Sequence, residues 1–289
     1  MTAWRLGRGR ALSLDQPRLI GILNVTPDSF SDGGAFPDAG AAFDRAMLMV
    51  GEGAEVIDVG GESTRPGARP VRADEQIRRT VPVIRRLRAR GDVLISIDTT
   101  SAAVARAALD AGADIVNDVS AGLDDPEMLA LVAARGCGVI LMHRLHAPRE
   151  DSYSDRYAQP PDYGDVVATV RDFLLERAAA AIASGITRDA IVIDPGLGFG
   201  KSVEQNYAII ARMAEFQQAG YPVLSAASRK SFIGRMSGVD HPAQRMLGSI
   251  AVSVAHCLAG VRLFRVHDVR AHCEALGVAA AIAAARSPG

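Results

Sequence analysis

The chain has 289 residues, and its 32 Lys and Arg against 33 Asp and Glu leave a formal net charge of −1 at pH 7. With no basic excess, neither nucleic acid nor an anionic membrane is an expected partner. Hydrophobic residues make up 48% and charged residues 22%, which excludes a disordered chain and allows a large core. No apolar run is long enough to span a membrane, and the arginine-rich start lacks the apolar block of a signal peptide. The three cysteines, Cys137, Cys257 and Cys273, lie far apart, as expected of reduced thiols in a cytoplasmic protein.

Eight short β-rich runs alternate with longer runs of helical periodicity. The predicted strands cover residues 19–25, 55–59, 93–97, 114–119, 138–142, 190–194, 222–226 and 261–266. Several are continuously apolar, as is typical of parallel strands buried on both faces. Eight such units predict an α/β fold, a closed (β/α)8 TIM barrel in one domain, with an open doubly wound sheet as the alternative. Residues 1–18 are expected to cap the bottom of a barrel formed by residues 19–289.

The helical segments carry recognisable local signals. Apolar residues recur every three or four positions in 43–50 and 166–174, which predicts two amphipathic helices. Another helix is expected to begin after Ser101, as an N-cap, and to end before Gly112, which suits the left-handed C′ position. Pro82 interrupts the helical run 77–87 and predicts a kink or a two-piece helix there.

Polar residues stand at or just after the end of every predicted strand. A barrel opens the carboxyl ends of all its strands on one face, where active sites lie, so these residues are expected to form one ring. Such a ring favours an active site over a set of unrelated turns and helix caps. Its members are Asn24, Asp58, Asp98, Asn117, His143, Asp194, Lys230, Arg265 and His267.

Three features near this ring have ordinary explanations. The run GLGFGKS (196–202) has neither the Walker nor the dinucleotide glycine spacing, so we interpret it as a flexible strand-to-helix turn. His143 and His146 make only a weak metal pair, because no third ligand stands near them in the sequence. The polar segment 143–164 is a loop of a length that is usually functional or mobile.

The ring divides into two parts by chemistry. One part offers acceptors and donors that suit a flat heterocycle: Asp98, Asn117, Asp194 and Lys230. The other offers donors to an anion such as pyrophosphate: Arg65, Arg265 and His267. Loops 26–40 and 60–72, rich in Gly, Pro, Ser and Asp, could close over the site and exclude water. The residues therefore predict a barrel enzyme with a pocket for a heterocycle and an anion.

Seven segments, in order along the chain, resemble the motifs of dihydropteroate synthase. The match runs in order from about residue 19 to 270, and seven ordered motifs make the resemblance specific. They are GILNVTPDSFSDGG (21–34), DVGGESTRPGA (58–68), SIDTT (96–100), IVNDVSAG (115–122), IDPGLGFGK (193–201), SRKSFIG (228–234) and RVHDV (265–269).

The resemblance implies a transferase of folate biosynthesis. Such an enzyme condenses 6-hydroxymethyl-7,8-dihydropterin diphosphate with p-aminobenzoate to give 7,8-dihydropteroate and pyrophosphate. Matched motif by motif, the residues that would hold the pterin are Asp98, Asn117, Asp194 and Lys230. Those that would bind the diphosphate are Thr64, Arg265 and His267, with Arg65 nearby. Those that would build the p-aminobenzoate pocket are Phe30, Pro66, Lys230 and Ser231.

The same resemblance implies a metal, an assembly and an inhibitor. Asn24 would ligate a Mg2+ ion that neutralises the leaving group. Catalysis would depend on Asp98, Lys230, Arg265 and His267. Members of the family are typically dimeric and are the targets of sulfonamides, so a homodimer with an intact sulfonamide pocket is expected.

Two positions depart from the family pattern, and two alternatives stay open. Ala226 stands where the family usually has Gly, and the loop after His143 is longer than usual. A pterin-dependent methyltransferase acting on a corrinoid protein is the first alternative, although SRKSF and RVHDV speak against it, because a methyl donor needs no pyrophosphate site. The second is an inactive paralogue that only binds a pterin or a partner.

Overall fold

A computed structural model of the chain describes residues 3–26 and 39–286, and it contains one eight-stranded parallel sheet. Strands adjacent in the sequence are adjacent in the sheet, and β10 returns to pair with β3. A parallel bridge between Ile193 and Val223 joins the two outermost strands, β8 and β9. The closed (β/α)8 barrel is therefore confirmed, and the open doubly wound sheet is wrong. The strands are β3 (Arg18–Asn24), β4 (Val56–Gly60), β5 (Leu94–Asp98), β6 (Ile115–Asp118), β7 (Gly138–Met142), β8 (Ile191–Asp194), β9 (Leu224–Ser225) and β10 (Leu263–Val266).

All eight predicted strands are present, and β9 differs most from its predicted range of 222–226. It is only two residues long. Pro222 has no N–H to donate, and its carbonyl accepts the N–H of Ile193 at 3.0 Å. The chain before β9 therefore contributes single contacts in place of a regular ladder.

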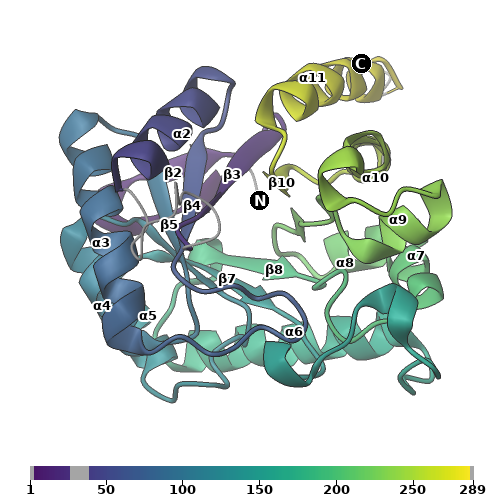
Figure 1. Cartoon of the computed structure of the whole chain (residues 1–289), viewed down its shortest axis with the longest axis horizontal. Coiled ribbons are helices and arrows are strands. Elements are labelled where there is room, and N and C mark those ends of the chain that lie inside the picture. The colour runs from purple at the N-terminus through teal and green to yellow at the C-terminus, as the bar shows by residue number, and fades with distance from the viewer. Residues whose placement is uncertain (1–2, 27–38, 287–289) are drawn as a thin grey trace.

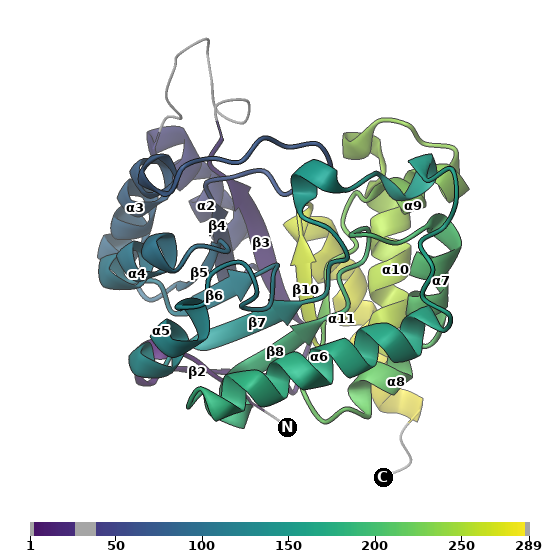
Figure 2. The ribbon, with the colours of Figure 1, turned by 90° about the horizontal axis from the view of Figure 1, so that it is seen from below.

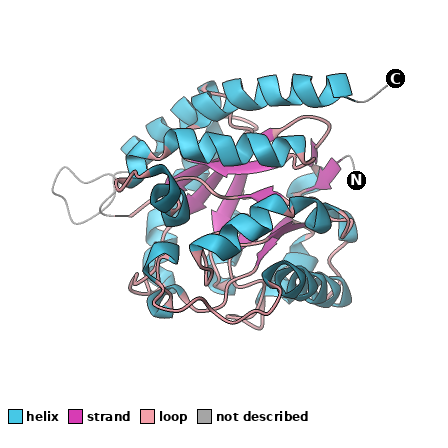
Figure 3. Cartoon of the chain, turned by 90° about the vertical axis from the view of Figure 1, so that its right-hand side faces the viewer, coloured by secondary structure: helices cyan, strands magenta, loops and turns pink. Residues whose placement is uncertain are grey.

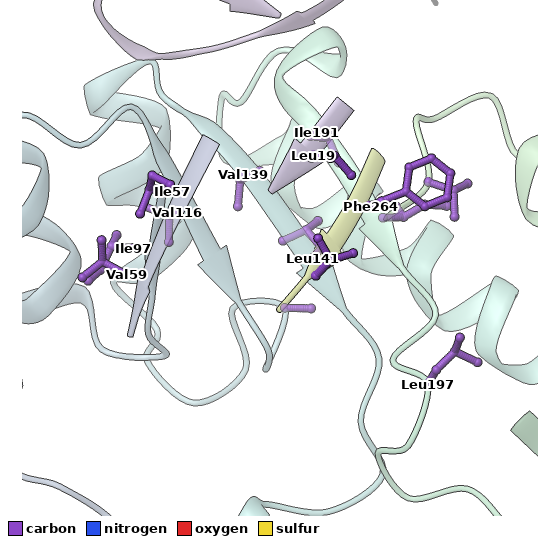
Figure 4. Close-up of a cluster of buried hydrophobic side chains, with 14 of the residues drawn as sticks. Leu19, Ile57, Val59, Ile97, Val116, Val139, Leu141, Ile191, Leu197 and Phe264 are labelled. Carbon is purple, nitrogen blue, oxygen red and sulfur yellow. The ribbon is translucent and has the colours of Figure 1, made fainter. Parts of the chain in front are cut away.

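Helices surround the barrel on its outside (Figures 1 and 3). Outward-facing strand residues such as Ile57, Val59, Ile97 and Val116 form the buried layer between the sheet and these helices (Figure 4). The helices are α2 (Ala39–Gly51), α3 (Ala73–Arg90), α4 (Ala102–Ala111), α5 (Met128–Arg135), α6 (Val166–Ala183), α7 (Val203–Ala211), α8 (Met213–Gln217), α9 (Ser231–Ser237), α10 (Met246–Leu258) and α11 (Val269–Arg286).

Two local predictions about helices need correction. Helix α3 runs through Pro82 as one helix of 18 residues, so the two-piece alternative is wrong. Pro82 lies on the exposed side, where water can satisfy the carbonyl that loses its partner, while neighbouring Val83 and Ile84 are buried. Ser101 occupies the N-cap position of α4 but makes no side-chain capping bond, and Asp125 accepts the N–H of Ala102 at 2.8 Å.

The first residues form an antiparallel hairpin, β1 (Ala3–Arg5) and β2 (Ala11–Ser13). Its apolar side chains, including Trp4 and Leu12, pack in one cluster with inward-facing residues near the amino ends of the strands, such as Ile20 and Val56. The indole N–H of Trp4 donates to the carbonyl of Ala190 at 2.9 Å. The hairpin therefore covers the amino ends of the strands, on the side where β2 lies in Figure 2.

Within residues 3–26 and 39–286, no helix combines the length and the apolar character needed to cross a lipid bilayer.

Candidate active site

The predicted polar ring forms a pocket at the carboxyl ends of the strands. A cavity of about 380 Å3 opens there, and Tyr153, Ser228 and Arg245 contribute to its wall. Eight of the predicted site residues line it: Asn24, Thr64, Arg65, Pro66, Lys230, Ser231, Arg265 and His267. Phe30 lies outside the described residues.

Three further predicted residues are buried at strand ends, namely Asp98, Asn117 and Asp194. The strand register places two of them at the level of the cavity wall. Asn24 pairs with Gly60, Gly60 with Asp98 and Asp98 with Asn117, so these residues form one row across β3, β4, β5 and β6. The heterocycle half of the predicted ring is thus continuous with the cavity.

Arg265 links the two halves of the ring. Its Nε donates to Asp58 Oδ2 at 2.6 Å, and its Nη2 donates to Asp98 Oδ2 at 2.7 Å. The amide of Asn117 donates to the same Asp58 oxygen at 3.0 Å. Arg265 therefore reaches from β10 across the barrel interior to the acidic residues of β4 and β5.

The two carboxylates keep spare acceptor capacity. Oδ1 of Asp58 and Oδ1 of Asp98 are buried and have no hydrogen-bond partner among the described residues. Burial raises the pKa of Asp98 to about 7, although the Arg265 cation opposes the shift. A ligand with N–H groups would satisfy such oxygens, since buried polar atoms are normally hydrogen-bonded.

Asp194 and Lys230 face the same region from β8 and from the turn after β9. Asp194 Oδ1 accepts the N–H of Gly196 at 2.8 Å, and burial raises the pKa of this carboxyl. The Lys230 ammonium lies 3.9 Å from the centre of the Phe199 ring, a cation–π contact. Burial and the neighbouring Arg265 lower the pKa of Lys230 to about 8.

The SRKS and RVHD motifs are held together at the opposite side of the cavity. Ser228 Oγ lies 3.0 Å from His267 Nδ1 and accepts the backbone N–H of His267 at 3.1 Å. Arg229 forms an ion pair with Asp268. Burial and nearby arginines lower the pKa of His267 to about 3, so its ring is neutral. In the tautomer in which Nδ1 accepts the Ser228 hydroxyl proton, Nε2 carries the N–H of the ring.

The long loop after β7 contributes to the same rim. The N–H of Ser154 donates to Ser231 Oγ at 3.1 Å, and the carbonyl of Pro148 accepts the N–H of Gly67 at 2.8 Å. Tyr153, between these contacts, lines the cavity. Segment 143–164 is therefore a strap that joins the loop after β4 to the start of α9, a role that the sequence left open.

The structure adds contacts between His143 and the glycine-rich run that the sequence did not indicate. Nδ1 of His143 lies 2.9 Å from the Lys201 ammonium, so this ring nitrogen is engaged by a cation. Lys201 also bonds to the carbonyls of Gly196 and Phe199, so the 196–202 segment is a strand-to-helix turn, as expected, and is held by internal hydrogen bonds. Across the described ranges, no group of three or more His, Cys, Asp or Glu could hold a metal ion.

The side-chain amide oxygen of Asn24 is compatible with the expected role of this residue as a Mg2+ ligand. Its side chain lies in the cavity wall, one strand from Gly60 and two from Asp98. Mg2+ is often bound by one or two protein oxygens, with substrate phosphates and water completing the shell. A single amide oxygen in the cavity wall fits that pattern, whereas a cage made only of protein ligands does not.

Sequence reasoning placed Asp58 in the polar ring without a role of its own, and it did not single out Phe199 or Tyr153. Asp58 had a signal: it interrupts the apolar run VIDVG at an inward position, between outward-facing Ile57 and Val59. Phe199 stood inside a run that was interpreted as a turn. Nothing in the sequence marks which residue of the 143–164 loop reaches the cavity.

Comparisons with known proteins agree with this geometry. A family model described as pterin binding enzyme matches residues 20–267. A dihydropteroate synthase of Mycobacterium leprae is 46% identical over 93% of this chain and 95% of its own length. The structure of Xanthomonas albilineans dihydropteroate synthase with 4-aminobenzoic acid aligns with a TM-score of 0.89 at 43% identity, over 99% of this chain and 100% of that one. The same enzyme in complex with 7,8-dihydropteroate aligns with a TM-score of 0.86 at 41% identity, over 98% and 100% of the two chains. The chain therefore belongs to the dihydropteroate synthase family of pterin binding enzymes.

Proposed function

We propose that this chain condenses 6-hydroxymethyl-7,8-dihydropterin diphosphate with p-aminobenzoate, and that its pocket divides between the substrates as its chemistry suggests. The observation that supports this is the ion pair between Arg265 and Asp98. It links the buried carboxylates at the strand ends to the cationic side chains that line the cavity. A molecule with a hydrogen-bonding heterocycle at one end and a diphosphate at the other matches both parts.

The pterin is assigned to the buried floor. Its ring N–H and amino groups would donate to Asp98 and Asp194, and its ring acceptors would receive bonds from Asn117 and Lys230. Burial of these residues favours the bound heterocycle, since water competes little for the same donors and acceptors.

The diphosphate is assigned to Thr64, Arg65, Arg265 and His267. His267 would donate from its neutral ring through Nε2, and Arg265 would use Nη1, since Nε and Nη2 serve the carboxylates. We place Mg2+ at Asn24, where a bound ion would supply positive charge to the leaving diphosphate. The exposed Arg65 would be the first of these cations to meet an incoming substrate.

The reaction follows from where charge develops. As the C–O bond to the diphosphate breaks, the pterin methylene becomes cationic, and the charge spreads into the ring. Asp98 is held in place by Arg265 and would stabilise that charge. The aryl amine of p-aminobenzoate then attacks the methylene carbon. The amine is neutral near pH 7, and the arylammonium formed by its attack is acidic enough to lose its proton to water, so no dedicated base is required.

The p-aminobenzoate is assigned to the rim beside Lys230. Pro66 and Ser231 line the cavity there, and Phe30 is assigned to the same pocket from its motif. Ser231 begins α9, and its hydroxyl is fixed by the N–H of Ser154. The carboxylate of the substrate would meet Ser231 and the Lys230 ammonium.

A cytoplasmic homodimer is part of the proposal. Helices α10 and α11 pack against each other and carry large exposed apolar side chains, among them Leu247, Val278 and Ile282 at 76%, 63% and 44% exposure. Such residues suit burial in a symmetric interface. The free thiols of Cys137, Cys257 and Cys273 suit a reducing compartment.

One assay tests the proposed reaction. The purified protein is incubated with both substrates, with and without Mg2+, and dihydropteroate and pyrophosphate are measured. We expect equal amounts of both products, with a strong dependence on Mg2+. Binding of the pterin without product would indicate an inactive paralogue, and methyl transfer from a methylated pterin to a corrinoid protein would indicate the methyltransferase.

A further inference from the structure

Lys201 is a fully buried lysine to which neither the motifs nor the proposed mechanism gives a role. Its ammonium has three hydrogens and three close acceptors, each at 2.9 Å: His143 Nδ1, the carbonyl of Gly196 and the carbonyl of Phe199. None of these acceptors is a carboxylate. Burial lowers the pKa of Lys201 to about 7. The three bonds hold its side-chain nitrogen in place.

The acceptors of Lys201 lie on two segments that border the cavity. His143 follows β7, while Gly196 and Phe199 belong to the loop between β8 and α7. Burial lowers the pKa of His143 to about 2, with the Lys201 charge adding to the effect, so this imidazole is neutral and can accept the bond. Lys201 therefore ties the ends of two adjacent barrel strands together from beneath the loop.

The β8–α7 loop has little freedom once Lys201 is in place. Its glycines Gly196, Gly198 and Gly200 have positive φ angles of 66°, 79° and 63°. A Cβ at Gly196 would collide with the carbonyl of His143. The N–H of Gly198 donates to Asn206 at 2.6 Å, and the carbonyl of Gly200 accepts from the Tyr163 hydroxyl at 2.8 Å.

This loop presents Phe199 to the cavity side chain Lys230. Phe199 is buried, and the Lys230 ammonium lies 3.9 Å from the centre of its ring. A Cβ at Gly198 would come within 3.0 Å of Lys230 Cδ, so the loop also packs along the lysine stem. The position of the Lys230 ammonium thus depends on where the loop holds Phe199.

We propose that Lys201 is a positioning residue, which fixes the Phe199 ring beneath Lys230 and so sets the Lys230 ammonium for substrate binding. The inference rests on the proposed function, since Lys230 is assigned there to both substrates. Lys201 itself touches no substrate. Removing its ammonium frees the carbonyls of Gly196 and Phe199, and the loop can relax away from Lys230.

A double-mutant cycle tests this route. Lys201→Met keeps the length of the side chain and removes the donors, and Phe199→Leu removes the ring. We expect Lys201→Met to lower kcat/KM for p-aminobenzoate by roughly tenfold to hundredfold, the range that a small misplacement of a binding group can cost. In the Phe199→Leu background the same change should cost less than threefold, because residues that act through one another are not additive. Additive losses would overturn the proposal.

Controls separate positioning from loss of stability and from failure of the proposed function. Trp4→Phe removes a buried hydrogen bond at the other end of the barrel, so it should lower Tm and leave kcat/KM unchanged. Lys201→Gln retains two N–H donors and should recover part of the activity, and it replaces Lys201→Met if the latter does not fold. Calorimetric binding of 6-hydroxymethylpterin gives a readout that needs no turnover. An unmodified protein without activity would contradict the proposed function, whereas an active protein with an additive cycle would contradict only the role of Lys201.

Discussion

The guanidinium of Arg265 donates to Oδ2 of Asp98 at 2.7 Å, so a cation assigned to the diphosphate directly contacts the carboxylate assigned to the pterin. The side chain of Arg265 is 17% exposed and that of Asp98 only 6%. Solvent therefore screens the pair only weakly. We therefore expect binding at one half of the pocket to change the electrostatic environment of the other half.

Arg265→Ala should weaken both halves of the pocket. Its position at the end of β10 alone suggests a loss of diphosphate binding only. The structure adds that Asp58 and Asp98 would remain as two buried carboxylates without their cation, a change that typically costs roughly 2–5 kcal/mol. Calorimetry should show weaker binding of the pterin both with and without its diphosphate, together with a lower Tm.

The exposed Arg65, changed to Ala, is the matched control and should affect only the diphosphate ligand. Unchanged affinity for the diphosphate-free pterin in Arg265→Ala would contradict this coupling.

Asp98→Asn should preserve the fold and slow the reaction. The change is nearly isosteric, but it removes the negative charge that faces the developing cation. We expect kcat to fall by ~10²-fold or more, the scale of one preorganised electrostatic contact. Steady-state rates with both substrates at saturation measure the effect. A kcat within threefold of the unmodified enzyme would exclude the role assigned to Asp98.

The pH dependence of kcat/KM for the pterin diphosphate should be bell-shaped. Asp98, with its pKa raised to about 7, must lose its proton to act, so the rate rises as the pH passes through about 7. Lys230, with its pKa lowered to about 8, must keep its proton, so the rate falls above about 8. Lys201, whose pKa is lowered to about 7, must also keep its proton, so its titration moves the start of the falling limb to lower pH and leaves the rising limb to Asp98. A rising limb that persists unchanged in Asp98→Asn would show that another group controls it.

The sequence predicted the fold and most of the ring because both depend on repeated local patterns. Eight apolar runs, each followed by polar residues, specify where strands end, and closure of a barrel then brings those ends together. The predicted strand boundaries agree closely with those of the structure, except at β9, where Pro222 has no backbone N–H to donate. Pro82 shows the limit of a local rule, because burial of Val83 and Ile84 on one side of α3 outweighs one missing hydrogen bond on the exposed side.

The pairings inside the barrel could not be predicted in the same way. Asp58 and Arg265 are 207 residues apart, and nothing local indicates that the arginine turns inward to meet the carboxylate. The role of Lys201 was equally hidden, because its partner His143 lies 58 residues away in the sequence and becomes a neighbour only when β7 and β8 are side by side. Such contacts depend on tertiary register, whereas the sequence pattern reports periodicity and residue type.

Asn24→Ala should change the metal requirement more than the substrate pocket. If Asn24 contributes one oxygen to Mg2+, its loss should raise the Mg2+ concentration that gives half-maximal activity, while binding of the diphosphate-free pterin stays unchanged. Titrating activity against Mg2+ at fixed substrate measures this shift, and Ser63→Ala, at another residue of the cavity wall, is the control. An identical Mg2+ curve for Asn24→Ala and the unmodified protein would remove Asn24 from the metal site.

Sulfonamides should inhibit this protein by competing with p-aminobenzoate. They carry the same aryl amine, and their sulfonyl group stands where the substrate has its carboxylate. Pro66, Lys230 and Ser231, which carry the proposed p-aminobenzoate pocket, line one cavity, and the contact from Ser154 keeps Ser231 in place. The departure at Ala226 also lies in the cavity wall, but a single methyl group should shift potency only modestly.

The kinetic pattern decides whether the pocket is the one assigned here. Initial rates are measured with varied p-aminobenzoate at several sulfonamide concentrations and saturating pterin diphosphate. We expect the apparent KM for p-aminobenzoate to rise with inhibitor while kcat stays constant.

Inhibition should also strengthen when pyrophosphate or pterin diphosphate is bound, because the loops that complete the pocket are expected to close only over a filled site. Ala226→Gly, which restores the usual family residue, should change the inhibition constant by less than the roughly tenfold that one methylene can be worth. Noncompetitive inhibition, or none well above the KM for p-aminobenzoate, would mean that this substrate binds elsewhere than between Pro66, Lys230 and Ser231.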